Sequence, residues 1–327
     1  MASRSLIVQP DDGVAPILDA ITSARTSLRI KMFAFSDPAL VGAVTAARRR
    51  GVLVRVMLNR ARRSGQEDNE ETHARLAAAG VDVLESNPAF ALTHEKSMVV
   101  DDSTAFVTSF NWTTKNLTRT RDYGIVTDHR REVAEIVECF EADWDRRPFN
   151  PGAHVHLVWC PINGRDRIAR MIDEAKHSLV VQNERYQDAV ILERLVRAAQ
   201  RGVKLHVMAR SPHALKQDQL VEGVVGLRLL DDVGVKIRKL NGLRLHGKML
   251  LADGVAAMVG SINLAPGSFD SRRELAIEVR DAAAVDRLHT IVRLDKADSH
   301  PLDLSDDGLT TELEDREEDA GAPASGE

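Results

Sequence analysis

Two stretches of the chain carry one pattern: His94-Glu-Lys-Ser-Met-Val-Val-Asp101 and His246-Gly-Lys-Met-Leu-Leu-Ala-Asp253. In each, the lysine stands two residues after the histidine and the aspartate five residues after the lysine. The second stretch begins 152 residues after the first, since 246 minus 94 is 152. The same offset joins three further pairs: Ser109 with Ser261, Asn111 with Asn263, and Asp122 with Glu274. A correspondence of this length indicates an internal duplication.

Segments outside the motifs repeat as well. Ala24-Arg-Thr-Ser-Leu28 reappears as Ala175-Lys-His-Ser-Leu179, and Ala79-Gly-Val-Asp-Val83 resembles Val233-Gly-Val-Lys-Ile237. The join falls at the turn-forming run Phe149-Asn-Pro-Gly-Ala153, so we assign residues 1–150 and 151–300 to two similar halves. Residues 301–327 are acidic and end in a stretch of low complexity, which predicts a disordered tail.

Helix and strand signals alternate in the same order in both halves. In the first half, apolar residues at helical spacing over 14–24 precede a β-rich run, 28–33, and a helix over 38–49 stops at Arg50-Gly51 before the apolar run 52–58. Two short β runs (97–100 and 105–108) and a closing helix up to Trp144 follow, and the second half repeats the opening order. The order predicts an α/β fold with two α/β/α halves, each a mixed, largely parallel sheet flanked by helices.

The spacing within each motif predicts where the side chains point. His94 and Lys96, like His246 and Lys248, stand two residues apart on a β run and so point to the same face. If a pseudo-twofold axis relates the halves, the two patches meet in one site. Lysine and asparagine would stabilise negative charge on phosphoryl oxygens, and the imidazoles could act as nucleophile and acid. Buried lysines without anionic partners are unfavourable, which argues against simple core packing.

The paired motif resembles that of the phospholipase D superfamily, which includes bacterial phospholipase D and cardiolipin synthase-like enzymes, over about residues 5–297. The resemblance implies that one histidine attacks phosphorus to give a phosphohistidine. The other protonates the leaving alcohol and then activates the acceptor. By resemblance to the family, His94 would be the nucleophile and His246 the acid–base. The family mechanism needs no metal or other cofactor, and His154-x-His156 lacks nearby carboxylate or cysteine partners.

The resemblance also implies roles for the other repeated residues. The phosphate would be held by Lys96, Lys248, Asn111 and Asn263, with Ser109 and Ser261 in support. Asp122 and Glu274 would orient the histidines through the second ring nitrogen. Asp101 and Asp253 complete the catalytic motif, although their place after apolar runs favours a turn or a local ion pair.

Two details concern the substrate. Thr108 stands where the family usually has glycine, whereas the second half keeps Gly260, so we expect one side of the pocket to be narrower. Glu184 and Tyr186 follow the first strand of the second half, and loops at the carboxyl ends of parallel strands border ligand sites. Both are candidates for substrate contact, with an ordinary loop role as the alternative.

Charge and composition constrain the partners. The 327 residues have a net charge of −5, but ten carboxylates and one arginine lie between 303 and 327. The remainder has 43 basic and 39 acidic residues, a net charge of about +4, which suits an anionic ligand but is weak for a duplex-binding protein. The two cysteines predict no disulfide. Without a signal-peptide region or a long apolar segment, we expect a cytoplasmic protein that touches membranes only peripherally.

These features lead to one expected function and its alternatives. We expect a phosphoric diester hydrolase, or transphosphatidylase, acting on the headgroup phosphodiester of glycerophospholipids, as a monomer because both motifs lie in one chain. A cardiolipin-synthase-type transferase would use the same site. A nuclease acting on DNA or RNA is the other alternative, although small nucleases of this superfamily typically carry one motif and dimerise. A binding protein without activity is disfavoured because both histidines, lysines and asparagines are present.

Overall fold

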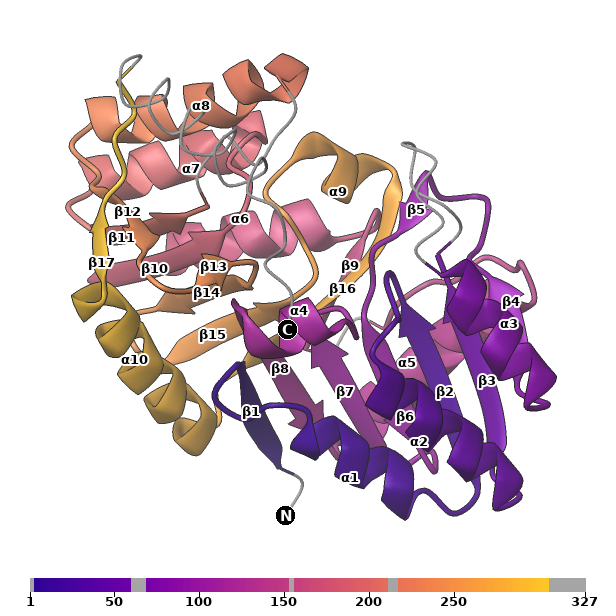
Figure 1. The fold of residues 1–327 in the computed structure, drawn as a ribbon. Helices are drawn as coiled ribbons and strands as arrows, with labels where there is room; N and C mark the ends of the chain where they lie inside the picture. The colour runs from indigo at the N-terminus through magenta and orange to yellow at the C-terminus, as the bar shows by residue number, and fades with distance from the viewer. Residues whose placement is uncertain (1–2, 60–68, 153–155, 211–216, 306–327) are drawn as a thin grey trace.

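The computed structural model describes residues 3–59, 69–152, 156–210 and 217–305, which form two similar halves (Figure 1). The first half contains β1 (Arg4–Gln9), α1 (Ala15–Ser23), β2 (Ser27–Met32), α2 (Pro38–Arg49), β3 (Leu53–Leu58), α3 (Glu70–Ala78), β4 (Asp82–Glu85), β5 (Leu92–Thr93), β6 (Ser97–Val100), β7 (Thr104–Thr108), α4 (Thr114–Thr118), β8 (Thr120–Thr127) and α5 (Arg130–Trp144). The second contains β9 (Leu157–Cys160), α6 (Gly164–Glu174), β10 (Ser178–Asn183), α7 (Ala189–Gln200), β11 (Lys204–Ala209), α8 (Gln217–Asp232), β12 (Ile237–Leu240), β13 (Arg244–Leu245), β14 (Lys248–Ala252), β15 (Ala256–Gly260), α9 (Pro266–Asp270), β16 (Arg272–Val279), α10 (Ala282–Ala297) and β17 (Ser299–Pro301).

The sheet of each half is mixed. In the first half β2, β3 and β4 are parallel, whereas β2–β6, β6–β7, β7–β8 and β8–β1 pair antiparallel. The second half repeats this arrangement with β10, β11 and β12 parallel and β14, β15, β16 and β9 antiparallel. The α/β fold in two halves is confirmed, but the expectation of largely parallel sheets is wrong. The motif strands follow one another through tight turns or one short helix, and such connections join antiparallel neighbours.

Local sequence explains where the predicted helices begin and end. The Asp37 side chain caps α2 by accepting hydrogen bonds from the backbone N–H groups of Ala39 and Leu40, and Pro38 occupies the first helical position. Gly51 follows the end of this helix with a φ of +95°, which glycine adopts without strain. Asp188 caps α7 in the same way through the N–H of Ile191. The predicted helix over residues 38–49 is therefore confirmed at both ends.

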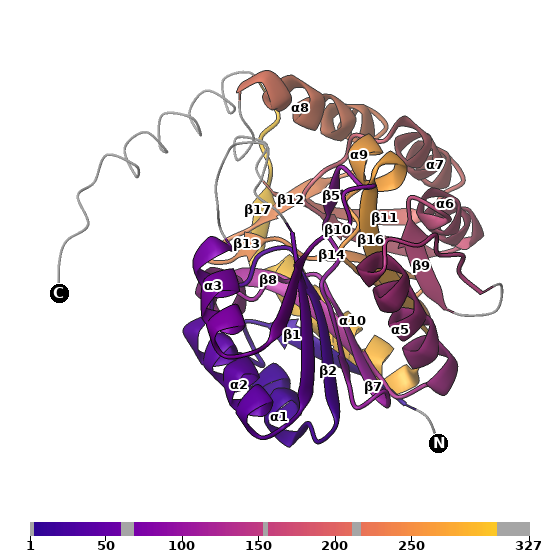
Figure 2. The ribbon, with the colours of Figure 1, turned by 90° about the vertical axis from the view of Figure 1, so that its right-hand side faces the viewer.

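Three large apolar cores among the described residues hold the layers together. Helices α1 to α3 pack on the outer face of the first sheet, and α6 to α8 on the outer face of the second (Figure 2). The third core lies between the sheets and includes Tyr123 and Val107 of the first half, Val259 and Leu275 of the second. Helices α5 and α10 contribute to it as well, with Ile136 among their buried residues. The halves thus share one interior.

The chain crosses between the halves immediately before each motif. Strand β5 belongs to the first half in sequence but pairs parallel with β16, with Thr93 opposite Arg273. Strand β13 of the second half pairs parallel with β8, with Leu245 opposite Arg121. Each motif histidine therefore follows a short strand that pairs with a strand of the other half.

Two reciprocal ion pairs join the halves beside these crossings. Arg273 binds Asp143 through two hydrogen bonds of 3.0 and 3.1 Å, and Arg121 donates to Asp295 at 3.0 Å. The four residues obey the 152-residue offset, since 273 minus 121 and 295 minus 143 both give 152. The ammonium of Lys31 lies 2.8 Å from Asp143 as well, and all three groups of this cluster are buried. Unpaired charges at such positions would be strongly destabilising.

Part of the segment assigned to the tail packs on the second half. The Leu302 N–H donates to the Ile237 carbonyl, and Leu302 and Leu304 are buried in the outer core. The rest of the predicted disordered tail, residues 306–327, lies outside the described residues.

We predict that Asp143→Asn destabilises the protein by about 3–5 kcal/mol, because it leaves Lys31 and Arg273 buried without their shared carboxylate. Equilibrium unfolding in guanidinium chloride measures this loss. Asp145→Asn in the same region is the matched control. Its side chain is 51% exposed and pairs with the exposed Arg147, so the change should stay below about 1 kcal/mol. Equal losses in the two variants would contradict the role of the buried cluster.

Candidate active site

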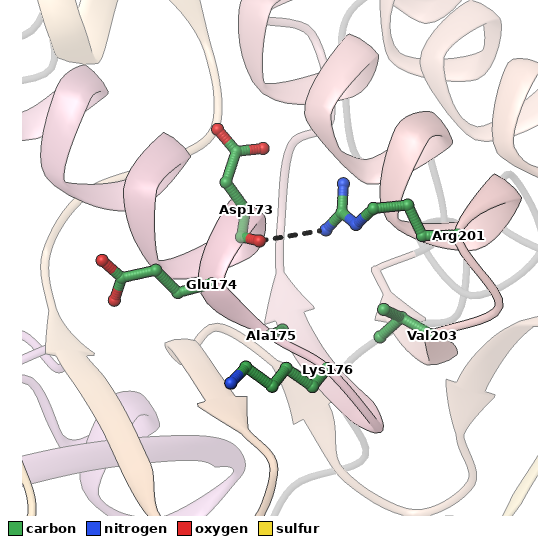
Figure 3. A pocket seen from close by; sticks show the side chains of 6 residues that line it. All are labelled: Asp173, Glu174, Ala175, Lys176, Arg201 and Val203. Atoms are coloured by element: carbon green, nitrogen blue, oxygen red, sulfur yellow. Dashed lines mark hydrogen bonds between the residues drawn. The ribbon is translucent and has the colours of Figure 1, made fainter.

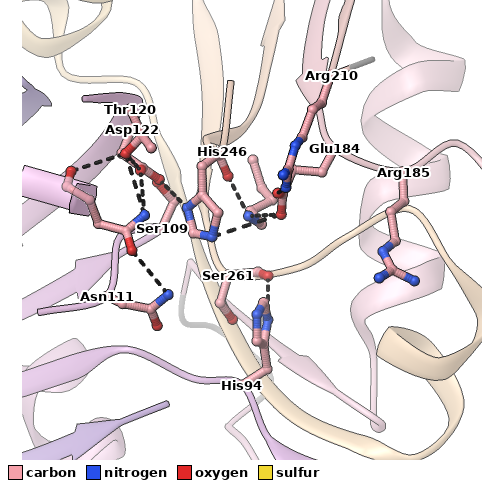
Figure 4. Close-up of polar contacts among 12 residues, drawn as sticks. His94, Ser109, Asn111, Thr120, Asp122, Glu184, Arg185, Arg210, His246 and Ser261 are labelled. Carbon is pink, nitrogen blue, oxygen red and sulfur yellow. Dashed lines mark hydrogen bonds and ion pairs between the residues drawn. The ribbon is translucent and has the colours of Figure 1, made fainter. Parts of the chain in front are cut away.

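The two histidines meet where the crossed segments lie side by side. His94 follows β5, and its backbone N–H donates to the Arg273 carbonyl at 2.9 Å. The backbone N–H of His246 donates to the Arg121 carbonyl at 3.1 Å. Figure 4 shows the two imidazoles near one another, with polar residues of both halves around them. The expected convergence of two motifs in one site is what the structure shows.

Each histidine contacts a carboxylate of the opposite half. His94 Nδ1 lies 2.9 Å from Glu274 Oε2 and 3.1 Å from the Ser261 carbonyl oxygen. His246 Nδ1 lies 2.8 Å from Asp122 Oδ1. A carboxylate on Nδ1 holds the proton there and leaves Nε2 for chemistry, as in other histidine–carboxylate pairs. The sequence paired these groups by offset but did not predict that the pairing crosses between halves.

The two carboxylates differ in their surroundings. Asp122 accepts hydrogen bonds of 2.6 Å from both Ser109 Oγ and Thr120 Oγ1. Burial favours its neutral form, but the charges of His246 and Lys248 and these hydrogen bonds outweigh it and lower the pKa of Asp122. Burial raises the pKa of Glu274 despite the nearby charge of Lys96. Asp122 is thus the more firmly ionised of the two.

A second difference lies just after β2 and β10. Phe33 follows Met32 in the first half and packs edge-on against His94, with ring centroids 4.9 Å apart. The ammonium of Lys96 lies 5.1 Å from the centroid of the same ring. At the corresponding place in the second half stands Glu184, whose Oε2 lies 2.7 Å from Lys248 Nζ and 3.8 Å from His246 Nε2. One histidine–lysine pair therefore faces an aromatic ring and the other a carboxylate.

Burial and like charges act strongly on the first pair. Burial, then the positive charges of Lys96, Lys248 and Arg272, holds the pKa of His94 well below 6.5. Burial and the charge of Lys248 also hold the pKa of Lys96 well below its usual range, against the nearby carboxylates. The His94 imidazole is therefore neutral at neutral pH, and its Nε2 carries a lone pair.

Glu184 is a charged member of the site. Its Oε1 accepts a hydrogen bond of 2.9 Å from Arg210, beside the Lys248 contact. Burial opposes ionisation, but the charges of Lys248, His246 and Arg210 hold the pKa of Glu184 well below its usual range. Glu184 therefore occupies, as an anion, the place next to Lys248 where a phosphate oxygen would bind. Tyr186 does not reach the site, because its buried hydroxyl donates to the Met208 carbonyl at 2.8 Å, so the interpretation of Tyr186 as a substrate contact is wrong.

The asparagines predicted to hold phosphate are buried close by. Asn111 and Asn263 stand three residues after the ends of β7 and β15, and each has a side-chain oxygen without a hydrogen-bond partner among the described residues. Asn111 Nδ2 lies 3.4 Å from Asn116 Oδ1. Ser109 supports Asp122, whereas Ser261 contributes its carbonyl to His94. Amide groups with unused hydrogen-bonding capacity suit an oxyanion ligand.

The motif aspartates lie at the other end of their strands. Asp101 follows β6 with a φ of +52° and accepts hydrogen bonds from the backbone N–H groups of Thr26 and Ser27. Asp253 does the same for His177 and Ser178 at the start of β10. These carboxylates anchor the entry of the central strand in each half. Their assignment to the catalytic set is not supported by this placement, which fits the alternative of a turn-fixing role.

Thr108 fits against a glycine rather than narrowing the site. It pairs across the sheet with Gly124, and a Cβ on Gly124 would lie 2.9 Å from Thr108 Cγ2. In the second half the sizes are exchanged: Gly260 pairs with Ala276, and a Cβ on Gly260 would lie 2.5 Å from the Ala276 Cβ. The extra side chain of Thr108 is therefore accommodated within the sheet.

Two other features do not form the site. A surface hollow lies at the ends of α6 and α7, where Arg201 Nη2 donates to the Asp173 carbonyl (Figure 3). Its lining residues are Asp173, Glu174, Ala175, Lys176, Arg201 and Val203. In the first half Arg50 likewise donates to the Ile21 carbonyl near the end of α1. The helix-capping arginine is therefore a structural feature of both halves.

The side chains of Glu95, Cys139 and Asp143 are of types that can bind a metal ion. The Lys31 ammonium lies 3.0 Å from Glu95, however, and takes the place of a cation. His154 lies outside the described residues.

A family model described as "Cardiolipin synthase, PLD-like domain" matches residues 17–144 and 168–295, which correspond to the two halves. The chain belongs to the phospholipase D superfamily. The family model thus matches the chain twice, once in each half.

Relatives of this phospholipase D-like chain include enzymes named for cardiolipin. It is 27% identical to cardiolipin synthase B of Escherichia coli K12 over 312 residues, covering 81% of this chain and 73% of that protein. It is 32% identical to the human mitochondrial cardiolipin hydrolase over 142 residues, 43% of this chain. The match spans 54% of that human protein, about half its length.

A solved structure shares the whole fold. The phosphatidylserine synthase of Haemophilus influenzae Rd KW20 superposes with a TM-score of 0.73, over 97% of this chain and 93% of that chain, at 10% identity. At this identity the likeness concerns the fold alone.

Some residues of the site were not predicted from the sequence. Thr120 donates a hydrogen bond to Asp122, Phe33 packs on His94, and Arg210 binds Glu184. Arg185 and Arg272 are close enough for their positive charges to repel each other. None belongs to the repeated motif. The signal that could have found them is a difference between the halves: Phe33 and Glu184 stand at equivalent positions after β2 and β10.

We predict that Glu184→Gln tightens the binding of inorganic phosphate by on the order of tenfold, because Lys248 and Arg210 lose a competing anion. Isothermal titration calorimetry measures the dissociation constant. Glu193→Gln, at an exposed pair with Arg197, is the control and should leave it unchanged. Unchanged or weaker phosphate binding in Glu184→Gln would contradict the view that Glu184 competes with phosphate for Lys248 and Arg210.

We predict that His94 stays neutral well below pH 6.5. Since its pKa is lowered in the folded state, protonation favours the unfolded chain, and stability falls as the pH drops below the unfolded value of about 6.5. Above that pH, His94 contributes no pH dependence. Long-range 1H–15N spectra of ¹⁵N-histidine-labelled protein report the midpoint, and a His94 midpoint at or above 6.5 would contradict the prediction.

Proposed function

We propose that this phospholipase D superfamily member cleaves the headgroup phosphodiester of a glycerophospholipid through a phosphohistidine and passes the phosphatidyl group to water or to an alcohol. The observation that carries the proposal is the pairing of two histidines, each with its Nδ1 on a carboxylate and its Nε2 available, beside two lysines. This set supplies a nucleophile, an acid and charge stabilisation from side chains alone.

The difference between the halves supports His94 as the nucleophile. A nucleophilic imidazole must be neutral, and burial together with the surrounding cations keeps His94 in that form. Phe33 packs edge-on against the ring, while Glu274 and the Ser261 carbonyl accept hydrogen bonds from the Nδ1–H group. In the first step the Nε2 lone pair of His94 forms the bond to phosphorus as the bond to the leaving oxygen breaks.

His246 is the better placed acid. The ionised Asp122 contacts its Nδ1, and the ionised Glu184 lies near its Nε2. Its Nε2 proton goes to the leaving oxygen in the first step. In the second step the neutral His246 takes a proton from water or an alcohol, whose oxygen bonds to phosphorus while the bond to His94 breaks and returns its electron pair to Nε2.

Lys96 and Lys248 stabilise the charge that develops on the phosphoryl oxygens. Lys248 contacts Glu184 and must exchange this partner for the phosphate when substrate binds. Lys96 donates to the His94 carbonyl at 2.5 Å and makes no ion pair with a described residue. The asparagine amides of both halves are buried, and each keeps a side-chain oxygen without a hydrogen-bond partner among the described residues.

A lipid substrate is favoured by the relatives, of which one is named as a synthase and one as a hydrolase of cardiolipin. The synthase match covers most of this chain, so transfer to a lipid alcohol has as much support as hydrolysis. No helix of the described residues is long and apolar enough to cross a membrane. We propose a monomeric enzyme that reaches phospholipid at the membrane surface from the cytoplasm.

The proposal is tested by product analysis with labelled phosphatidylglycerol vesicles, with and without ethanol as acceptor, in the presence of a chelator. We expect phosphatidate from water or a phosphatidyl–alcohol product from transfer. His94→Ala should give neither product. His246→Ala should retain the phosphatidyl group on His94 with a substrate that has a good leaving group, detected by mass spectrometry of the peptide.

Single-stranded and duplex DNA are incubated in parallel. Cleavage of DNA with lipid untouched would overturn the lipid assignment and favour the nuclease alternative. Phosphate trapped on residue 246 in His94→Ala, with His246→Ala fully active, would overturn the assignment of roles.

A further inference from the structure

The carboxylate that contacts His246 is hydrogen-bonded on both of its oxygens. Asp122 Oδ1 lies 2.8 Å from His246 Nδ1 and accepts a hydrogen bond of 2.6 Å from Ser109 Oγ. Asp122 Oδ2 accepts a hydrogen bond of 2.6 Å from Thr120 Oγ1, and Asn116 Nδ2 lies 3.4 Å from the same oxygen. Figure 4 shows Thr120 and Ser109 next to this carboxylate. Contacts on both oxygens restrict the rotation of the carboxylate and hold Oδ1 toward the imidazole.

The carboxylate that contacts His94 has less support. Glu274 Oε2 lies 2.9 Å from His94 Nδ1, but Glu274 Oε1 has no hydrogen-bond partner among the described residues. Burial raises the pKa of Glu274, although the hydroxyl groups of Ser268 and Ser261 favour its ionised form. The two histidines therefore contact carboxylates that are held with unequal firmness.

The two residues on Asp122 Oδ2 have different counterparts in the second half. The offset of the motif places Ser268 at the position of Asn116 and Arg272 at that of Thr120, since 268 minus 116 and 272 minus 120 both give 152. Asn116 lies in α4, and Thr120 opens β8. The difference in carboxylate support thus follows a difference in sequence at two positions outside the repeated motif.

Asn116 also connects Asp122 to an amide of the set predicted to hold phosphate. Its Oδ1 lies 3.4 Å from Asn111 Nδ2 and accepts a hydrogen bond of 3.0 Å from Thr113 Oγ1. The backbone N–H of Asn116 donates to the same hydroxyl at 3.2 Å, which fixes the asparagine further. An amide nitrogen has two N–H donors, so Asn111 keeps one for a phosphate oxygen. A continuous path of side chains therefore runs from Asn111 through Asn116 to Asp122.

We propose that Thr120 and Asn116 are positioning residues, which hold Asp122 in the orientation that serves His246. The inference rests on the proposed phosphodiesterase function and adds to it two residues that make the acid–base side of the site differ from the nucleophile side. Both side chains are buried, and neither takes part in bond making. Without the Thr120 hydroxyl, Asp122 would keep a buried oxygen without its closest donor, which is unfavourable, and would turn away from His246.

A spectroscopic experiment tests this role without turnover. Thr120→Val replaces the hydroxyl with a methyl group, and ¹H NMR spectra follow the downfield Nδ1 proton signals of the two histidines. The signal of His246 should shift or disappear in this variant, whereas that of His94 should stay, because Glu274 and not Asp122 contacts His94. Thr120→Ser keeps a hydroxyl and should restore the His246 signal.

Two further variants complete the comparison. Thr118→Val removes a hydroxyl that lies two residues away, is exposed and donates to the Thr114 carbonyl at 2.7 Å, so it should behave as wild type. Asn116→Ser introduces the residue of the second half and removes the longer contact to Asp122. It should change the His246 signal in the same direction but less, and it provides a second measurement if Thr120→Val does not fold.

Steady-state kinetics separate positioning from substrate binding. With phosphatidylglycerol in mixed micelles, Thr120→Val should lower kcat on the order of tenfold and leave KM within about twofold, because the variant affects the acid–base group and not the lysines that hold phosphate. Thr120→Ser should recover most of kcat, and Thr118→Val should retain all of it.

An unchanged His246 signal in both Thr120→Val and Asn116→Ser would overturn the positioning role. A changed signal with full kcat in Thr120→Val would overturn its importance for the reaction. If the wild-type protein turns over no lipid, the proposed function fails, while the NMR comparison still decides whether Thr120 and Asn116 hold Asp122 against His246.

Discussion

The crossing of two short segments between the halves is the constraint on which the active site depends. Residues 92–93 and 244–245 pair with strands of the other half, and the following histidines inherit that position. His94 thereby meets Glu274, and His246 meets Asp122. Neither half contains a complete histidine–carboxylate pair on its own. The buried ion pairs Arg273–Asp143 and Arg121–Asp295 lie next to these crossings and hold the two sheets in the register that the site requires.

A duplicated unit produces two equal sites in principle, yet the proposed two-step reaction needs unequal groups. The structure supplies the inequality through residues outside the motif. Phe33 keeps one histidine–lysine pair beside an apolar ring, whereas Glu184 places a carboxylate beside the other. The more firmly ionised Asp122 supports His246, and the neutral His94 faces Glu274, whose pKa is raised by burial. The same pseudo-twofold frame thus surrounds the two imidazoles with different groups.

The sequence predicted the parts of this site that repeat. Because the motif recurs at a constant offset, His94, His246, both lysines and the paired carboxylates could be assembled before any coordinates, and alternating helices and strands predicted the α/β halves. The partners of the histidines could not be assigned, because strand pairing between residues about 150 apart is not encoded in local pattern. Largely parallel sheets were expected from the helix–strand alternation alone, which says nothing of the antiparallel motif strands. Glu184 was predicted from its place in the loop after the first strand of the second half. Phe33, Arg185 and Arg272 were not predicted, because a comparison of repeated residues does not find residues that differ between the halves.

The central claim, that each histidine is served by the carboxylate of the other half, can be tested by observing the Nδ1 protons directly. Hydrogen-bonded imidazole Nδ1 protons give separate downfield signals in ¹H NMR spectra, which can be assigned with the single histidine variants. The account predicts that Asp122→Asn shifts or removes the signal of His246 and leaves that of His94, and that Glu274→Gln does the reverse. If Asp122→Asn instead removed the His94 signal and spared His246, the crossed arrangement would be contradicted.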